Sequence, residues 1–255
     1  MNLIDAFILG VVEGLTEFLP ISSTGHLILV SWLLGIKQTE THKAFEVAIQ
    51  LGSILAVVFL YKEKIFSSIQ LWKRLIIAFI PTGILGFILY KLIKSLFSPY
   101  VVAIMLIVGG IIFIIVEKVY SEKEYHINDL ESIPYTKAFF IGVFQSFAMV
   151  PGTSRSGATI IGGLLLGLSR KTAAEFSFLL AVPTMFVATF YDIFKHHSEF
   201  QIDNWLNLGL GFITAFIFAV FSIKFLLSFI SKHSFIPFGI YRIIVGLVFL
   251  FFLYF

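Results

Sequence analysis

Residues 13–26 read EGLTEFLPISSTGH and interrupt an apolar segment that runs from residue 3 to residue 34. A second apolar segment, 138–168, is interrupted in the same way by PGTSRSG at residues 151–157. Because proline, glycine and consecutive hydroxyl residues are poor helix formers, each segment is predicted to form a half-helix, a break and a second half-helix. Non-helical backbone at membrane depth is stable only where protein buries it or where it lines a wet cavity. Each break is therefore predicted to lie in a buried, polar place.

The whole chain has the composition of a polytopic membrane protein. Its 255 residues are 58% hydrophobic and only 13% charged, and the mean hydropathy is +0.98. Soluble domains usually carry about a quarter charged residues, so a soluble globule, a disordered chain and a fibrous chain are excluded. The chain has no cysteine, which excludes disulfides, thiolate nucleophiles and zinc–thiolate sites. The net charge is +3, but no basic stripe with interleaved aromatics is present, so no nucleic-acid partner is expected.

Six further apolar runs are each long enough to cross a bilayer core of about 30 Å. They cover residues 44–61, 74–94, 99–117, 173–191, 205–230 and 236–255. The predicted fold class is an all-α integral membrane protein, with six transmembrane helices and two re-entrant helical hairpins at 3–34 and 138–168.

The distribution of Lys and Arg favours segments that turn back over segments that cross. If both broken segments turn back, about eleven Lys and Arg residues lie on the cytoplasmic side and about five outside. If both crossed, Arg170 and Lys171 would exchange sides with the acidic loop 192–204, against the positive-inside rule. The re-entrant arrangement is therefore predicted.

This topology divides the chain into two halves, 1–118 and 138–255, joined by a cytoplasmic linker at 119–137. Four identities recur at a constant offset of 132: Gly10 with Gly142, Val11 with Val143, Ser22 with Ser154, and Gly25 with Gly157. Each half has one hairpin and three spans, and an odd number of crossings gives an inverted-topology repeat. The two breaks are then expected to meet near the membrane midplane.

Three charged residues belong to the breaks. Glu13 and Glu17 are four residues apart and share one helix face, and Arg155 lies in the second break. Each intramembrane charge costs on the order of 3 kcal/mol even on the lenient insertion scale. A buried packing ion bridge would explain these charges, but it would leave His26 and six hydroxyl residues without a role. The hydroxyl residues are Ser22, Ser23, Thr24, Thr153, Ser154 and Ser156.

These residue types in this arrangement favour binding of a phosphate ester. Helix N-termini bind anions, and an arginine fork binds phosphate with two hydrogen bonds. The paired carboxylates would repel such an anion unless a divalent cation lay between them, and Mg²⁺ typically binds carboxylates together with substrate phosphates. N-capping explains one or two of the hydroxyls. His26, three residues after Ser23, suits acid–base or nucleophilic chemistry.

Other polar residues in the apolar runs carry a weaker signal. Gln50 and Gln145 could reach the site or bond between helices. Glu46, Glu175 and Arg242 lie near predicted span ends and are expected to snorkel to the surface.

At the two breaks the sequence resembles the undecaprenyl-diphosphate phosphatase family of bacterial membranes, the bacitracin-resistance type. The resemblance covers essentially the whole chain and is strongest at 13–26, at 151–157 and at FEVAIQLG, residues 45–52. It implies a hydrolase that converts undecaprenyl diphosphate, a C55 polyprenyl lipid, to the monophosphate and inorganic phosphate. It also implies a divalent cation (Mg²⁺ or Ca²⁺), the bacterial cell membrane and an active site open to the extracytoplasmic side.

The resemblance also implies roles for individual residues. Glu13 and Glu17 would hold the metal, and Arg155 would bind the diphosphate. Two nucleophiles stay open: Ser23 with His26 as its base or stabiliser, or His26 itself through a phosphohistidine. The remaining substrate-binding residues would be Ser22, Thr24, Thr153, Ser154, Ser156 and Gln50.

A transporter or flippase for polyprenyl phosphate lipids is the rival interpretation. Inverted repeats with broken helices at the midplane are common in transporters. The carboxylates, hydroxyls, His26 and Arg155 favour hydrolysis, since lipid translocation needs no nucleophile. The sequence leaves open whether two copies pair as a homodimer.

Overall fold

The computed structural model describes residues 1–121, 126–195 and 205–254, and this part of the chain is helical without strands. The linker 119–137 and the loop 192–204 of the sequence analysis therefore lie partly outside the described residues. The helices are α1 (Leu3–Thr16), α2 (Ser23–Leu33), α3 (Glu40–Leu60), α4 (Lys62–Ser67), α5 (Ile69–Ile88), α6 (Tyr90–Ser95), α7 (Pro99–Val119), α8 (Tyr135–Ser146), α9 (Arg155–Leu165), α10 (Arg170–Lys195), α11 (Trp205–Ile230) and α12 (Ile236–Tyr254), with a short 3₁₀ helix, η1 (Phe147–Met149), between α8 and α9.

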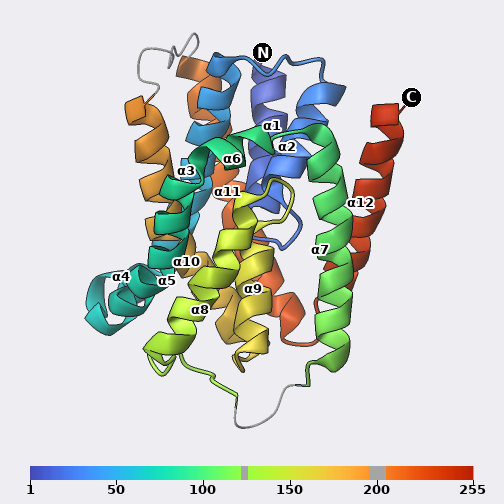
Figure 1. Ribbon diagram of the computed structural model, residues 1–255. Coiled ribbons are helices and arrows are strands. Elements are labelled where there is room, and N and C mark those ends of the chain that lie inside the picture. Colours follow the sequence, from blue (N-terminus) through green and yellow to red (C-terminus); the bar gives the residue numbers. More distant parts are fainter. Residues whose placement is uncertain (122–125, 196–204, 255) are drawn as a thin grey trace.

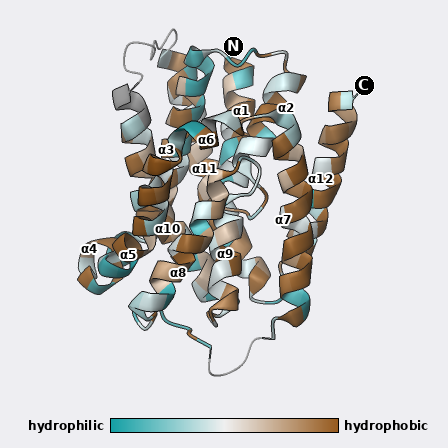
Figure 2. Ribbon diagram, viewed as in Figure 1, coloured by the Kyte–Doolittle hydropathy of each residue, from teal (hydrophilic) through white to brown (hydrophobic). Residues whose placement is uncertain are grey.

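Six helices of the described chain, α3, α5, α7, α10, α11 and α12, are long and apolar enough to cross a membrane. The apolar residues run along their length, as Figure 2 shows. The prediction of an all-α membrane protein with six spanning helices is therefore confirmed.

Several predicted span boundaries are wrong; for example, α5 begins at Ile69 rather than residue 74, and α10 begins at Arg170 rather than residue 173. The first span begins at Glu40 rather than residue 44, because the hydroxyl of Thr39 caps the helix by accepting from the His42 N–H. The run 74–94 is not one helix, since α5 ends at Ile88 and Leu89 leaves helical geometry (φ −95°, ψ 9°). The short helix α6 follows as a separate element.

Each broken segment forms a helical hairpin (Figure 1). From the end that carries both termini, α1 runs to the middle of the molecule and α2 returns; from the opposite end, α8 runs to the middle and α9 returns. The two tips touch, because the Ser156 hydroxyl donates to the Leu19 carbonyl at 2.9 Å. It stays a prediction that each hairpin enters and leaves the membrane on the same side, and that the two halves form an inverted repeat.

Small residues fix the outer arm of each hairpin against a spanning helix. A Cβ at Gly10 would lie 2.6 Å from the Gly211 carbonyl oxygen of α11. A Cβ at Gly142 would collide with the Ala78 carbonyl of α5. Because lipid supplies no hydrophobic force between helices, such close backbone packing is a main source of association in membranes. The arms therefore hold the tips at a defined position relative to α5 and α11.

Candidate active site

The inner arm of each hairpin starts with the same local structure. Ser22 precedes α2 at φ +71° and Ser154 precedes α9 at φ +76°, and these are the two non-glycine residues with positive φ in the described chain. Each serine oxygen accepts from the N–H three residues on, Gly25 at 3.4 Å and Gly157 at 3.1 Å. Such strained backbone costs on the order of 1–3 kcal/mol and clusters at functional sites. Here it directs two helix N-termini to the hairpin tips, where anions bind well.

A cavity of about 150 Å³ lies at the tips. Its lining residues are Glu17, Ser22, Ser23, Thr24, Gln50, Phe97, Ala148, Met149, Pro151, Gly152, Ser154, Arg155 and Met185. Seven predicted site residues thus share one cavity, and four others (Glu13, His26, Thr153 and Ser156) are not part of its lining. Apart from Gln50 of α3, the polar lining comes from the two breaks, so the cavity depends on both halves of the chain.

Glu17 connects the two hairpins chemically. Its Oε2 accepts from the Ser23 hydroxyl at 2.5 Å, and its Oε1 accepts from Arg155 Nη2 at 2.9 Å. The Glu17 and Arg155 side chains are only 6% and 13% exposed. The other Arg155 amino group, Nη1, donates to the Ser177 carbonyl at 2.8 Å and so fixes the fork. A carboxylate in contact with a serine hydroxyl can take its proton, and a fixed guanidinium can stabilise phosphoryl charge.

Glu13 is a buried carboxylate without a hydrogen-bond donor. It is fully buried, neither side-chain oxygen has a partner, and its charge interacts with that of Glu17 one turn later. An uncompensated buried charge is strongly destabilising, so a cation fits here. Within the described residues no three His, Cys, Asp or Glu side chains group as a metal site. Two carboxylates fit a divalent cation whose remaining ligands are water and substrate phosphate oxygens.

His26 is held beside the first break rather than in the cavity lining. Its Nδ1 lies 2.8 Å from the Ser22 carbonyl oxygen, which can only accept, so Nδ1 carries the proton. Its Nε2 lies 2.9 Å from the hydroxyl of Tyr241, and the two rings stack at 5.6 Å. Both ring nitrogens are thus engaged. Tyr241 is a neighbour that the sequence analysis missed.

The other predicted polar residues take different places. Ser154 and Ser156 hydrogen-bond each other at 3.1 Å, and the Ser156 hydroxyl also holds the first break. The Thr153 hydroxyl is buried without a partner. Gln145 bonds threonine side chains of neighbouring helices and does not reach the cavity.

The expectation that Arg242 snorkels to the surface is wrong. Its side chain is fully buried and donates to four backbone carbonyls, so it gains from the protein interior the hydrogen bonds that snorkelling would gain from water. Glu46 and Glu175 keep partial exposure, and they pair with His42 and Lys64.

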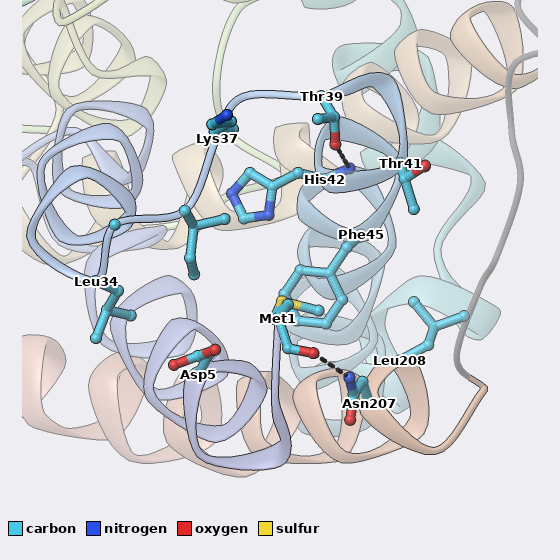
Figure 3. Close-up of a pocket in the computed structure, with 13 residues that line it drawn as sticks. Met1, Asp5, Leu34, Lys37, Thr39, Thr41, His42, Phe45, Asn207 and Leu208 are labelled. Carbon is cyan, nitrogen blue, oxygen red and sulfur yellow. Dashed lines mark hydrogen bonds between the residues drawn. The ribbon is translucent and has the colours of Figure 1, made fainter.

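A larger cavity, about 550 Å³, lies where α1, α3 and α11 begin (Figure 3). Its lining includes Asp5, Lys37 and Asn207, and the His42 ring points into it, but it contains none of the predicted site residues. The predicted site residues Ser23, Glu17 and Arg155 line the smaller cavity instead.

Comparisons with known proteins identify the family of the chain. The family model described as bacitracin resistance protein BacA matches residues 6–248. The chain is 71% identical over 252 residues to a protein of Persephonella marina named undecaprenyl-diphosphatase, covering 99% of both chains. It is 70% identical over 249 residues to a protein of the same name from Sulfurihydrogenibium sp. (98% of both) and 61% identical over 253 residues to one from Wolinella succinogenes (99% of both). The chain belongs to the bacitracin resistance protein BacA family.

Proposed function

We propose that this chain hydrolyses undecaprenyl diphosphate to undecaprenyl phosphate and inorganic phosphate, and so returns the lipid carrier to envelope polymer synthesis. The relatives' shared name supports the substrate. The observation that carries the proposal is the Glu17 carboxylate, which contacts both the Ser23 hydroxyl and the Arg155 guanidinium in one cavity. A transporter would need no such contact, and none of the relatives reported above is named as one.

The terminal phosphate would be held by positive charge and by free backbone donors. Arg155 lines the cavity, and α2 and α9 begin at its wall. The first N–H groups of a helix have no backbone partner within the helix, so those that Ser22 and Ser154 do not cap (they cap Gly25 and Gly157) are available to phosphate oxygens. Hydroxyls of Thr24 and Ser154 lie in the same lining, and Gln50 adds an amide. Thr153 and Ser156 do not line the cavity, so they would affect phosphate binding indirectly, through the conformation of the second break.

The chemical step uses residues already in contact. The Ser23 oxygen attacks the terminal phosphorus while its proton passes to Glu17. The bond from that phosphorus to the bridging oxygen breaks, and its electron pair leaves with undecaprenyl phosphate. Water then attacks the phosphoserine, Glu17 returns its proton to the serine oxygen, and inorganic phosphate is released. Arg155 stabilises the charge of the transferring group, which is the main task in phosphoryl transfer.

We assign His26 a supporting role. A phosphohistidine would require the ring to give up a hydrogen bond to the Ser22 carbonyl or to Tyr241, and then to reach a cavity that it does not line. Instead, the ring donates to the Ser22 carbonyl and so holds the backbone of the residue that precedes the nucleophile.

A divalent cation, Mg²⁺ or Ca²⁺, would be held by Glu13 and Glu17. The support is the unpartnered pair of Glu13 oxygens, and each Glu17 oxygen keeps a second lone pair beside its present bond. When bound, the cation would neutralise the repulsion between these carboxylates and the diphosphate.

We place the protein in the bacterial cell membrane with the cavity open to the extracytoplasmic side. The helical hairpins fit re-entrant segments of an inverted repeat. Both hairpins that line the cavity come from one chain, so a single copy supplies a complete site without a homodimer.

Phosphate release from undecaprenyl diphosphate by the purified protein tests the function. With Mg²⁺ the wild type should release phosphate, and EDTA should abolish the release. Glu17→Ala and Arg155→Ala should each lower the rate by about 100-fold or more, since each removes transition-state stabilisation. Glu63→Gln, an exposed acid on α4, is the matched control and should keep wild-type activity. A wild type that releases no phosphate would refute the proposal.

A further inference from the structure

Arg242 is a fully buried cation within the apolar helix α12. Burial of a guanidinium is unfavourable unless its N–H groups find acceptors. Arg242 finds four, and all are backbone carbonyl oxygens. Because Arg242 has no exposed surface, any function of its side chain must lie in its contacts inside the protein.

The four carbonyls belong to three different parts of the fold. Nη1 donates to Pro20 in the first break at 3.1 Å, and Nη2 donates to Gly152 in the second break at 3.0 Å. Nη2 also donates to Met105 of α7 at 3.1 Å, and Nε donates to Leu106 at 3.3 Å. One planar group therefore ties both breaks to each other and to a spanning helix.

The two contacted break positions are equivalent in the two halves. Pro20 and Gly152 are separated by the same offset of 132 that relates Ser22 to Ser154. Pro20 lies three residues before Ser23, and Gly152 lies three residues before Arg155. The guanidinium thus sets the separation of the two segments that carry the nucleophile and the phosphate-binding arginine.

Two glycines provide the space for this group. A Cβ at Gly109 of α7 would collide with Nη2, and a Cβ at Gly157 of α9 would lie 3.1 Å from Nη1. The guanidinium is confined by the backbone on both sides, so its position is defined sterically as well as by hydrogen bonds.

We propose that Arg242 is a positioning residue for phosphoryl transfer: it holds the two hairpin breaks in the register that brings Ser23 and Arg155 to one cavity. It does not line that cavity, so it acts through the backbone and not on the substrate. This inference rests on the function proposed above.

The test compares Arg242→Gln and Arg242→Lys with Arg170→Gln. Arg170 pairs with Glu117 at 2.7 Å away from the hairpin tips, so its variant is a matched control for loss of a structural arginine. All variants are compared as full-length protein in one detergent. The thermal midpoint of each variant is measured first, and kcat and KM for undecaprenyl diphosphate are then measured at a temperature well below that midpoint. The split between kcat and KM is the decisive readout, because a merely structural role would not move kcat of folded protein.

Both Arg242 variants should lower kcat by about 100-fold, since a misplacement of about 1 Å can have that effect, and should change KM less than about threefold. Lysine should not rescue, because one ammonium group cannot span both breaks. Arg170→Gln should lower the midpoint and keep kcat. Gly109→Ala displaces the guanidinium without changing it, so this variant should reproduce the loss of kcat. If the Arg242 variants do not fold, Gly109→Ala serves as the test in their place.

Wild-type kcat in Arg242→Gln or in Gly109→Ala would overturn the inference. So would an equal loss of kcat in Arg170→Gln. An inactive wild type would instead overturn the proposed function itself, so the two failures are distinguishable.

Discussion

Glu17 uses each of its carboxylate oxygens for a different partner, the Ser23 hydroxyl and the Arg155 guanidinium. Hydrogen bonds to a charged group are shorter and about twice as strong as neutral ones, so this arrangement compensates three buried polar groups at once. At the residue scale the site is therefore already formed before substrate arrives. Beside it, both oxygens of the buried Glu13 side chain have no hydrogen-bond partner, and in the second break neither does the Thr153 hydroxyl.

The nucleophile can be identified from the chemistry of a trapped phosphoenzyme. Quenching in neutral detergent during turnover, followed by separate acid and alkali treatments, should yield a phosphoenzyme that survives acid and is cleaved by alkali, as expected for an ester on Ser23. The reason is that Ser23 lines the cavity whereas His26 has both nitrogens engaged beside it. Ser23→Ala is the control and should trap no phosphate. An acid-labile adduct that persists in Ser23→Ala would identify His26 as the nucleophile.

Glu13 should control the response of the fold to a divalent cation. A ligand that binds only the folded state stabilises it, by about 2.7 kcal/mol at a hundredfold excess over its Kd. Mg²⁺ added with soluble inorganic diphosphate should therefore raise the thermal midpoint of the wild type, and Glu13→Gln should abolish this rise. Glu63→Gln should respond like the wild type. An unchanged rise in Glu13→Gln would show that the cation binds elsewhere.

At the scale of elements, the hairpins are positioned by backbone contact rather than by large side chains. On α1, Gly10 and Gly14 face α11, and on α8, Gly142 faces α5. The sequence analysis found Gly10 and Gly142 as a repeated pair, but it did not predict their packing partners. Those partners are set by tertiary arrangement, which periodicity along one helix does not encode.

Gly142→Ala should destabilise the protein. Its methyl group would collide with the Ala78 carbonyl, and overpacking typically costs about 1–3 kcal/mol. Gly209→Ala on α11 is the matched control, because no atom lies within 4 Å of its added Cβ. It should be neutral or stabilising by about 1 kcal/mol or less through helix propensity. Thermal midpoints in one detergent measure both, and equal midpoints would contradict the packing argument.

For the whole molecule, the sequence was sufficient where a signal is local. The length of the apolar runs predicts the six spanning helices, and the two polar breaks predict that residues of both breaks, Glu17 and Arg155 among them, meet at one buried polar site. The role of Arg242 could not be predicted, because its carbonyl partner Pro20 is 222 residues away along the chain. Every residue has a backbone carbonyl, so the residue type at position 20 does not indicate this contact. The one available signal was an arginine inside the predicted span 236–255, which the sequence analysis interpreted as snorkelling from near the span end.

The orientation of the whole molecule is open to a direct labelling test, since the natural chain has no cysteine. Figure 1 places α4 and the start of α10 at the end opposite the termini, and Lys64 of α4 contacts Glu175 of α10 at 3.5 Å. The excess of Lys and Arg at that end favours the cytoplasm. In intact cells, a membrane-impermeant maleimide should therefore label Lys37→Cys but not Glu63→Cys or Lys171→Cys.

Permeabilised cells are the control, and there all three cysteines should react because all three positions are exposed. Cysteine-free protein should stay unlabelled throughout. Labelling of Glu63→Cys and Lys171→Cys from outside, with Lys37→Cys protected, would reverse the orientation. Reaction of Glu63→Cys and Lys171→Cys from opposite sides would contradict the hairpins themselves, because a second broken segment that crossed the membrane would separate these two positions.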